Sequence, residues 1–146
     1  MVTRTADAEW RGSLKDGDGS VALGSGAFEG RYSFQSRFED GAGTNPEELL
    51  GAAHAACFSM VLSLALGESG FTPQRITTSA AVNIEPTAGG FSITRIHLKT
   101  EAEVPGIDSE AFGAVADAAK HGCPVSKALA AVPITLDAQL VGAASL

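Results

Sequence analysis

Two cysteines, Cys57 and Cys123, are the residues of this sequence best suited to covalent chemistry. Cysteine attacks as a thiolate, and helix N-termini and nearby cations favour that ionised form. Cys123 stands directly before Pro124, where a helix can begin, and it follows Lys120 and His121. On electrostatic grounds alone, Cys123 is therefore the stronger candidate for a reactive thiol.

Cys57 lies in an alanine-rich stretch with a helical pattern. A free cysteine in such a setting is most often a small buried apolar residue. His54 precedes it by one helical turn and is close enough to reach the thiol. A single histidine on an alanine-rich face, however, is more often a structural hydrogen bonder. Both a packing role and a chemical role are therefore open for Cys57.

The remaining polar residues exclude several other kinds of site. The three histidines and two cysteines lack the CxxC, HxxxH and HExxH spacings typical of zinc sites. No GxGxxG or P-loop pattern occurs. Residues 16–19 (Asp-Gly-Asp-Gly) predict a turn, because the spacing and the distal glutamate of a calcium loop are missing. We expect neither a metal nor a cofactor.

Composition and charge indicate a folded protein without a polyanionic partner. The chain has 146 residues, 45% of them hydrophobic and 18% charged, which predicts one domain over residues 1–146. A net charge of −7 argues against binding to nucleic acid or to a membrane surface. The N-terminus lacks a signal-peptide pattern, and the apolar region 49–66 is interrupted by polar residues and glycine, which favours a buried helix. We therefore expect a cytoplasmic protein.

The elements that must position the cysteines follow from hydrophobic periodicity and turn signals. Asn45 and Pro46 predict the start of a long central helix, with Glu48 closing a capping box with Asn45. The pattern predicts an α+β fold. The expected helices are residues 45–66, 108–121 and 123–130, and the expected strands are 8–12, 20–23, 31–38, 76–85, 91–104 (with a bulge between 93 and 96) and 134–140.

The segment around Cys57 carries a family resemblance. Residues 43–60, GTNPEELLGAAHAACFSM, together with residues 36–39, closely resemble the osmotically inducible protein C (OsmC) family, which is related to the organic hydroperoxide resistance (Ohr) proteins. The similarity continues through residues 66–73, 104–107 and 122–126. It therefore covers nearly the whole chain and includes both cysteines.

The resemblance implies a specific activity and site. Cys57 matches the peroxidatic cysteine, Cys123 the resolving cysteine, and Arg37 and Glu47 the polar pair that serves the thiolate. The implied protein is a thiol peroxidase that reduces organic hydroperoxides, and hydrogen peroxide more weakly, through a Cys57 sulfenic acid and a Cys57–Cys123 disulfide. The resemblance thus makes Cys57 the first thiol to react, whereas electrostatics alone favours Cys123.

The resemblance also implies partners. It suggests an intertwined homodimer in which two long central helices pack against antiparallel-rich β-sheets, with active sites at the subunit interface. An external dithiol, of the lipoyl type in relatives, would reduce the disulfide.

Helix geometry adds one prediction to this list. Glu47 precedes Cys57 by ten residues, which is about 15 Å along a helix axis. A glutamate at that distance is poorly placed to hold an arginine against a thiolate on its own helix. We therefore predict that Glu47 serves Cys57 of the partner subunit. Arg37 is a second candidate for serving the partner's Cys57.

Two other classes of function compete with a peroxidase. One is a non-catalytic dimer that holds a hydrophobic ligand while the cysteines pack, and the other is a redox sensor that signals through a disulfide. The joint presence of Arg37, Glu47, Cys57 and Cys123 argues against a simple binding cleft. The length of 146 residues leaves no room for the output domain of a sensor.

Overall fold

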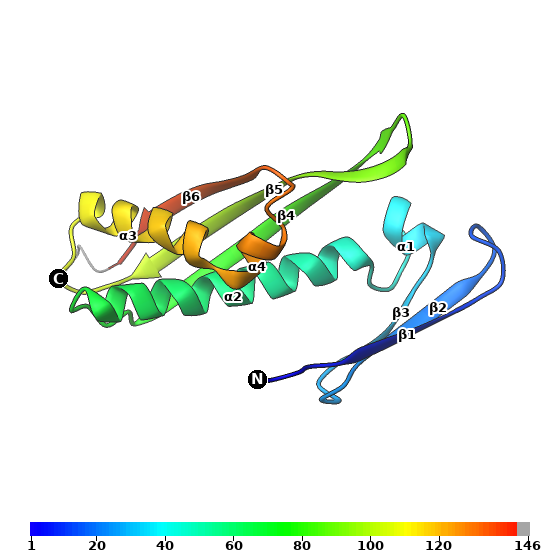
Figure 1. Ribbon diagram of the computed structural model, residues 1–146, viewed down its shortest axis with the longest axis horizontal. Helices are drawn as coiled ribbons and strands as arrows, with labels where there is room; N and C mark the ends of the chain where they lie inside the picture. Colours follow the sequence, from blue (N-terminus) through cyan, green and yellow to red (C-terminus); the bar gives the residue numbers. More distant parts are fainter. Residues whose placement is uncertain (143–146) are drawn as a thin grey trace. The chain divides into compact units, whose positions relative to one another are not determined.

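Residues 1–142, which the computed structural model describes, form six β-strands and four α-helices (Figure 1). Their contacts divide the chain into two compact units, one covering residues 1–49 and the other beginning at Leu50. The α+β class predicted from the pattern is confirmed. A single domain over residues 1–146 stays a prediction.

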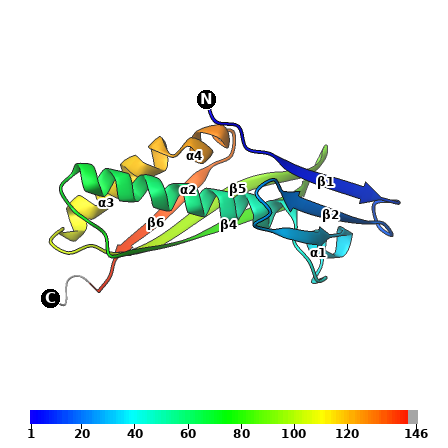
Figure 2. The same ribbon diagram turned by 90° about the horizontal axis from the view of Figure 1, so that it is seen from below.

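The first unit contains a three-stranded antiparallel sheet in the order β1-β2-β3 (Figure 2). Its strands are β1 (Ala6–Arg11), β2 (Asp18–Leu23) and β3 (Glu29–Tyr32). Gly19 pairs with both Trp10 and Tyr32, whose ring centroids lie 5.4 Å apart. A Cβ at Gly19 would lie 2.6 Å from the Tyr32 ring and 2.7 Å from the Trp10 ring. Only glycine therefore allows this aromatic pair to close across the middle strand.

Helix α1 (Phe34–Phe38) replaces the second half of a predicted strand. The alternation of residues 31–38 predicts one strand, but β3 ends at Tyr32, so the prediction is wrong for residues 34–38. Ser33 is the reason: its hydroxyl accepts from the Ser36 N–H, and the Ser36 hydroxyl accepts from the Ser33 N–H. This capping box starts a helix.

Helix α2 (Pro46–Glu68) begins as the sequence predicts. The Asn45 side chain accepts from the Glu48 N–H at 2.7 Å. The predicted capping box is not completed, because the Glu48 carboxylate accepts from the Thr44 hydroxyl at 2.8 Å instead. By length and mean hydropathy (1.9) α2 is also apolar enough to cross a membrane. Its residues Phe58, Leu62 and Leu66 are fully buried in the protein core, but only 28% of its apolar window is buried within the chain.

The second unit has a sheet in the order β4-β5-β6. Strands β4 (Arg75–Thr87) and β5 (Gly90–Glu103) form the predicted hairpin, and β6 (Ile134–Leu140) runs parallel to β5. The predicted bulge is confirmed at Thr94, because Asn83 pairs with Arg95 whereas Ile84 pairs with Ile93. Helices α3 (Ser109–Gly122) and α4 (Pro124–Ala128) follow the hairpin.

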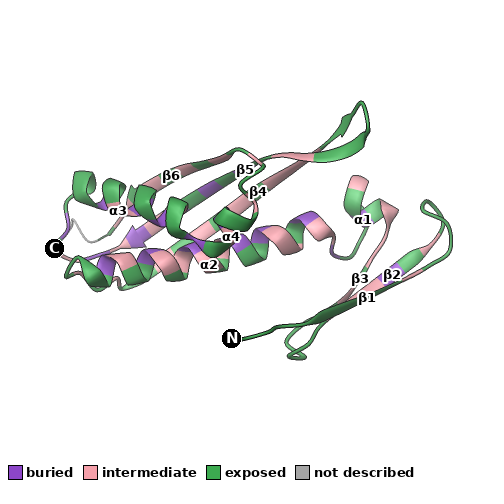
Figure 3. Cartoon of the chain, in the orientation of Figure 1, coloured by how far each residue is buried: buried purple, intermediate pink, exposed green. Residues whose placement is uncertain are grey.

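One core holds the second unit together (Figure 3). Buried side chains of α2, β5 and α3 meet there, and the Cys123 side chain belongs to the same cluster. The largest of these side chains are Phe58, Leu62, Leu66, Ile96, Leu98 and Phe112. The link between α3 and α4, which carries Cys123, is therefore fixed by packing.

The N-terminus of α3 offers a test of this local order. The Asp108 side chain accepts from the Ala111 N–H at 2.7 Å and caps the helix. We expect Asp108→Ala to lower the free energy of unfolding by about 0.5–2 kcal/mol in urea denaturation. Asp108→Asn keeps the acceptor and should retain most of the stability. Equal losses in both variants would assign the effect to the carboxylate charge instead.

Candidate active site

The two cysteines meet in the second unit. Cys57 comes from the middle of α2 and Cys123 from the N-cap of α4, and their sulfur atoms lie 3.1 Å apart although 66 residues separate them. Both are free thiols, and an S–S bond of ~2.05 Å needs only a small further approach. The pair is therefore arranged to interconvert between two thiols and a disulfide.

The two thiols differ in exposure. Cys123 is completely buried, whereas Cys57 is partly exposed. An external oxidant must contact the sulfur that it oxidises, so access favours Cys57 as the first thiol to react. Exposure thus agrees with the assignment that the family resemblance implies.

The electrostatics of the isolated unit favour the opposite thiol. Burial raises the pKa of Cys57, and the neighbouring Cys123 raises it further, against a lowering by hydrogen bonding from the Val125 backbone. Burial also acts to raise the pKa of Cys123, but the backbone of Ser126, the Cys57 thiol and the Ser126 hydroxyl together outweigh it and lower this pKa. Within this unit, Cys123 is the more acidic thiol.

The sequence predicts two causes of this acidity, a helix N-terminus and nearby cations. The sequence suggests Lys120 and His121 as the stabilising cations, but neither is among the groups that lower the pKa of Cys123. The His121 ring instead contacts the Asp117 carbonyl at 2.9 Å, and the Lys120 ammonium points to the Ile134 carbonyl at 3.5 Å. The first turn of α4 thus supports the predicted effect of a helix N-terminus, whereas the cation effect stays a prediction.

Arg37 and Glu47 form a two-pronged ion pair within the first unit. Arg37 Nε donates to Glu47 Oε1 at 2.8 Å, and Nη2 donates to Oε2 at 3.0 Å. The Glu47 side chain is only 7% exposed, whereas that of Arg37 is 36% exposed. Such a fork holds the guanidinium in a fixed plane and leaves Nη1 outside this contact. The pair presents a rigid, half-exposed cation.

His54 lies beside the cysteines but bonds to a different residue. Its Nε2 is 2.7 Å from the Ser126 hydroxyl oxygen, and both side chains are buried. The alternative of a His54–Cys57 contact, which sequence spacing allows, is not the one formed. Ser126 is not singled out by sequence reasoning, because nothing in its local pattern indicates that it meets α2.

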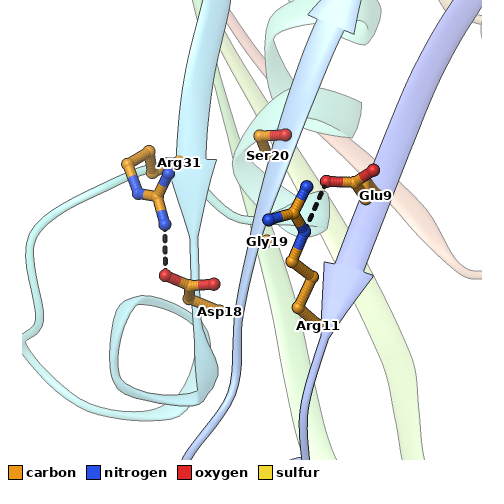
Figure 4. A pocket seen from close by; sticks show the side chains of 6 residues that line it. All are labelled: Glu9, Arg11, Asp18, Gly19, Ser20 and Arg31. Atoms are coloured by element: carbon orange, nitrogen blue, oxygen red, sulfur yellow. Dashed lines mark hydrogen bonds and ion pairs between the residues drawn. The ribbon is translucent and has the colours of Figure 1, made fainter.

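The rest of the described chain offers weaker sites. No group of three His, Cys, Asp or Glu side chains that could hold a metal occurs among residues 1–142. A polar pocket on the first sheet is lined by two ion pairs, Arg11 with Glu9 and Arg31 with Asp18 (Figure 4). Its charges are neutralised in pairs and its lining contains no nucleophilic thiol. The cysteine pair is thus the best candidate for an active site.

Comparison with known proteins settles the family. A family model described as OsmC-like protein matches residues 39–137, which include both cysteines. The chain belongs to the OsmC family. The resemblance carried by residues 36–60 is thereby confirmed.

Individual OsmC relatives cover most of the chain. Peroxiredoxin OsmC of Escherichia coli is 53% identical over 140 residues, which are 95% of this chain and 97% of that protein. The organic hydroperoxide resistance protein of Xanthomonas axonopodis pv. citri is 34% identical over 89 residues, covering 60% of this chain and 61% of that one. The crystal structure of the organic hydroperoxide resistance protein OhrB of Bacillus subtilis superposes with a TM-score of 0.74 at 26% identity, covering 92% of this chain and 97% of that one. The OsmC-like fold is therefore confirmed.

Proposed function

We propose that this protein is a cysteine-based peroxidase that reduces organic hydroperoxides and, more weakly, hydrogen peroxide. The observation that carries the proposal is the 3.1 Å contact between one accessible and one buried thiol. The relative at 53% identity, a peroxiredoxin, supports the same activity. Neither a metal nor a cofactor is needed for this chemistry.

The reaction follows from the two thiols. The Cys57 thiolate attacks the terminal oxygen of ROOH, the O–O bond breaks, and the alkoxide leaves as ROH after it takes up a proton. Cys57 is then a sulfenic acid. The Cys123 thiolate attacks the Cys57 sulfur, the S–O bond breaks, and the hydroxide leaves as water after protonation. An external dithiol, for which the lipoyl type is the first candidate, reduces the resulting disulfide.

We further propose that Arg37 and Glu47 serve Cys57 of the partner subunit in an intertwined homodimer. Glu47 lies in the first turn of α2, and Cys57 is ten residues further on, about 15 Å along the helix axis. The pKa of Cys57 is raised within its own unit, and no cation is among the groups that shift it. A thiolate at neutral pH therefore needs a positive charge from elsewhere, and the rigid Arg37–Glu47 pair is suited to supply it.

The exposed side of α2 supports the dimer. Met60 is 76% exposed and Leu64 62% exposed, and Ala53 and Ala56 continue the same side toward the N-terminus. Apolar residues that recur at this helical spacing form a continuous stripe. Such a stripe on a protein surface marks an interaction site. A second copy of α2 would cover it, and the active sites would then lie at the interface.

Peroxide consumption tests the proposed function. We expect the protein to consume cumene hydroperoxide through many turnovers with a dithiol reductant in the cytoplasmic pH range. Cys57→Ser should lose all turnover, whereas each Cys123→Ser chain should still be oxidised once, by one equivalent of peroxide. Mass spectrometry of the oxidised variants provides the second readout.

Other results of this assay would favour other functions. The reverse pattern in the two variants would make Cys123 the nucleophile, in agreement with its lower pKa. A single oxidation per wild-type chain would favour a redox sensor. No oxidation with any peroxide would favour a protein that binds a hydrophobic ligand.

A further inference from the structure

We propose that Ser36 and Asn45 are positioning residues that join α1 to the start of α2. By joining these helices they hold the Arg37 guanidinium on Glu47. Both residues belong to the segments that carry the family resemblance, yet the proposed reaction uses neither of them. The value of this arrangement for catalysis rests on the proposed function, but its effect on Arg37 is measurable without peroxide.

The Ser36 hydroxyl makes a buried contact between the two helices. It donates to the Thr44 carbonyl oxygen at 2.7 Å, and only 7% of Ser36 and 6% of Thr44 is exposed. The Ser33 carbonyl oxygen, at 3.2 Å, is the more distant second acceptor. The Ser36 hydroxyl oxygen also accepts from the Ser33 N–H at 2.8 Å, within the capping box of α1. One hydroxyl can serve as donor and acceptor together, so Ser36 ties the start of α1 to the segment directly before α2.

Asn45 makes a second link in the opposite direction. Its side-chain N–H donates to the Ser36 carbonyl oxygen at 3.0 Å, while its side-chain oxygen accepts from the Glu48 N–H. The same amide thus caps α2 and reaches α1. An aspartate would cap the helix equally well but has no N–H to donate. The two helices are therefore joined by two side chains, each bonded to a backbone carbonyl of the other segment.

The connection between the helices is shaped to allow these contacts. Gly43 has a φ of +116°, and a Cβ there would lie 2.5 Å from the Arg31 carbonyl oxygen. The Thr44 N–H donates to this same oxygen at 2.8 Å. The positive φ and the close approach both require glycine. The chain therefore turns at Gly43 and places the Thr44 carbonyl where the Ser36 hydroxyl can reach it.

These links fix the backbone on both sides of the ion pair. Arg37 follows Ser36 directly, and Glu47 is two residues after Asn45. The two prongs between Arg37 and Glu47 are 2.8 and 3.0 Å long. The guanidinium carbon also lies over the Phe38 ring, 5.3 Å from its centre. An arginine that is ordered in advance loses little further freedom when it meets its target, which is the advantage of a positioned group in catalysis.

The ordering of Arg37 bears on the first step of the proposed reaction. The guanidinium would stabilise the thiolate of Cys57 of the partner subunit. A cation does this only while it stays within a few ångströms of the sulfur, because the interaction weakens with distance and with the entry of water. A loosened Arg37 would therefore leave less thiolate at neutral pH.

Hydrogen exchange of Arg37 tests the proposal without peroxide. In protein with isotope-labelled arginine, NMR follows the exchange of the Arg37 Nε–H, whose signal is identified by its absence from Arg37→Met. Ser36→Ala and Asn45→Ser should each speed this exchange about tenfold, because a hydrogen bond between the helices is lost. Serine is also a good N-cap, so Asn45→Ser gives a reading even if Ser36→Ala folds poorly.

Two matched variants serve as controls. Ser36→Thr keeps the hydroxyl. Thr44→Val removes the hydroxyl that donates to Glu48 at 2.8 Å but keeps the carbonyl that accepts from Ser36. Both should exchange close to the wild-type rate, although Thr44→Val loses a hydrogen bond to a charged group. Unchanged exchange in Ser36→Ala and Asn45→Ser, or an equal increase in Thr44→Val, would overturn the proposal.

A second experiment measures kcat/KM for cumene hydroperoxide against pH. Ser36→Ala and Asn45→Ser should lose about tenfold activity at neutral pH and recover at alkaline pH, where Cys57 ionises without a cation. A mere loss of folded protein would lower the activity equally at every pH, and that result would overturn the proposal. Faster Arg37 exchange in a protein that consumes no peroxide would refute the proposed function and still support the positioning of Arg37.

Discussion

A mixed dimer of one Cys57→Ser chain and one Arg37→Met chain is expected to regain about half of the wild-type peroxidase activity, although both parent dimers are impaired. The Cys57→Ser dimer has no nucleophile. The Arg37→Met dimer would lack the cation that we propose for the thiolate, and its thiolate fraction should fall by about 10- to 1,000-fold. If the Arg37–Glu47 pair serves the partner subunit, the mixed dimer contains one complete site. Co-purification through two different affinity tags isolates it for the peroxide assay.

The matched control places both substitutions on the same chain. A mixed dimer of wild type with a Cys57→Ser, Arg37→Met chain should be nearly inactive, because the remaining Cys57 then faces the altered Arg37. If each pair served its own chain, the first mixed dimer would be nearly inactive and the second would keep about half of the wild-type activity. Glu47→Gln should follow Arg37→Met in both combinations, since Glu47 holds the guanidinium through two hydrogen bonds.

Leu64→Glu is expected to convert the protein into monomers and to remove most of its activity. Leu64 lies on the exposed apolar side of α2 with Met60. A carboxylate there is harmless on a free subunit, but in the proposed dimer it would be buried, at a cost of several kcal/mol for each copy. Analytical ultracentrifugation measures the change in mass. The activity should fall at least as far as that of Arg37→Met, because Cys57 of a monomer would lack the arginine of a partner subunit.

Leu14→Glu is the matched control for this change. Leu14 is also 62% exposed and lies in the turn between β1 and β2. It should leave both mass and activity unchanged. A Leu64→Glu protein that remains a fully active dimer would show that α2 is not the interface.

Local signals determine how well the fold can be predicted from sequence. Strand β6 has the predicted bounds because residues 134–140 alternate without interruption. The start of α2 is equally well marked by Asn45 and Pro46. The strand prediction fails at residues 34–38 because aromatic alternation resembles a strand, whereas the Ser33–Ser36 hydrogen bonds that start α1 depend on backbone geometry. The residue pattern likewise does not predict that the Glu48 carboxylate accepts from the Thr44 hydroxyl.

The site was less accessible to sequence reasoning than the fold. Periodicity places Cys57 in a helix and Cys123 at a helix start, but their contact depends on the packing of α2 against α4. Only the family resemblance implies their pairing and the roles that we propose for Arg37 and Glu47. The contact between His54 and Ser126 joins residues 72 positions apart, and no local spacing predicts it.

The burial of Cys123 also bears on which sulfur of the disulfide a reductant attacks. In the proposed disulfide an incoming dithiol would reach the sulfur of Cys57, because the sulfur of Cys123 is enclosed by the core. The first mixed disulfide would therefore form on Cys57, and Cys123 would be the leaving group. A thiol with a lowered pKa leaves faster. The same enclosed sulfur would thus close the catalytic cycle as a leaving group after acting in it as a nucleophile.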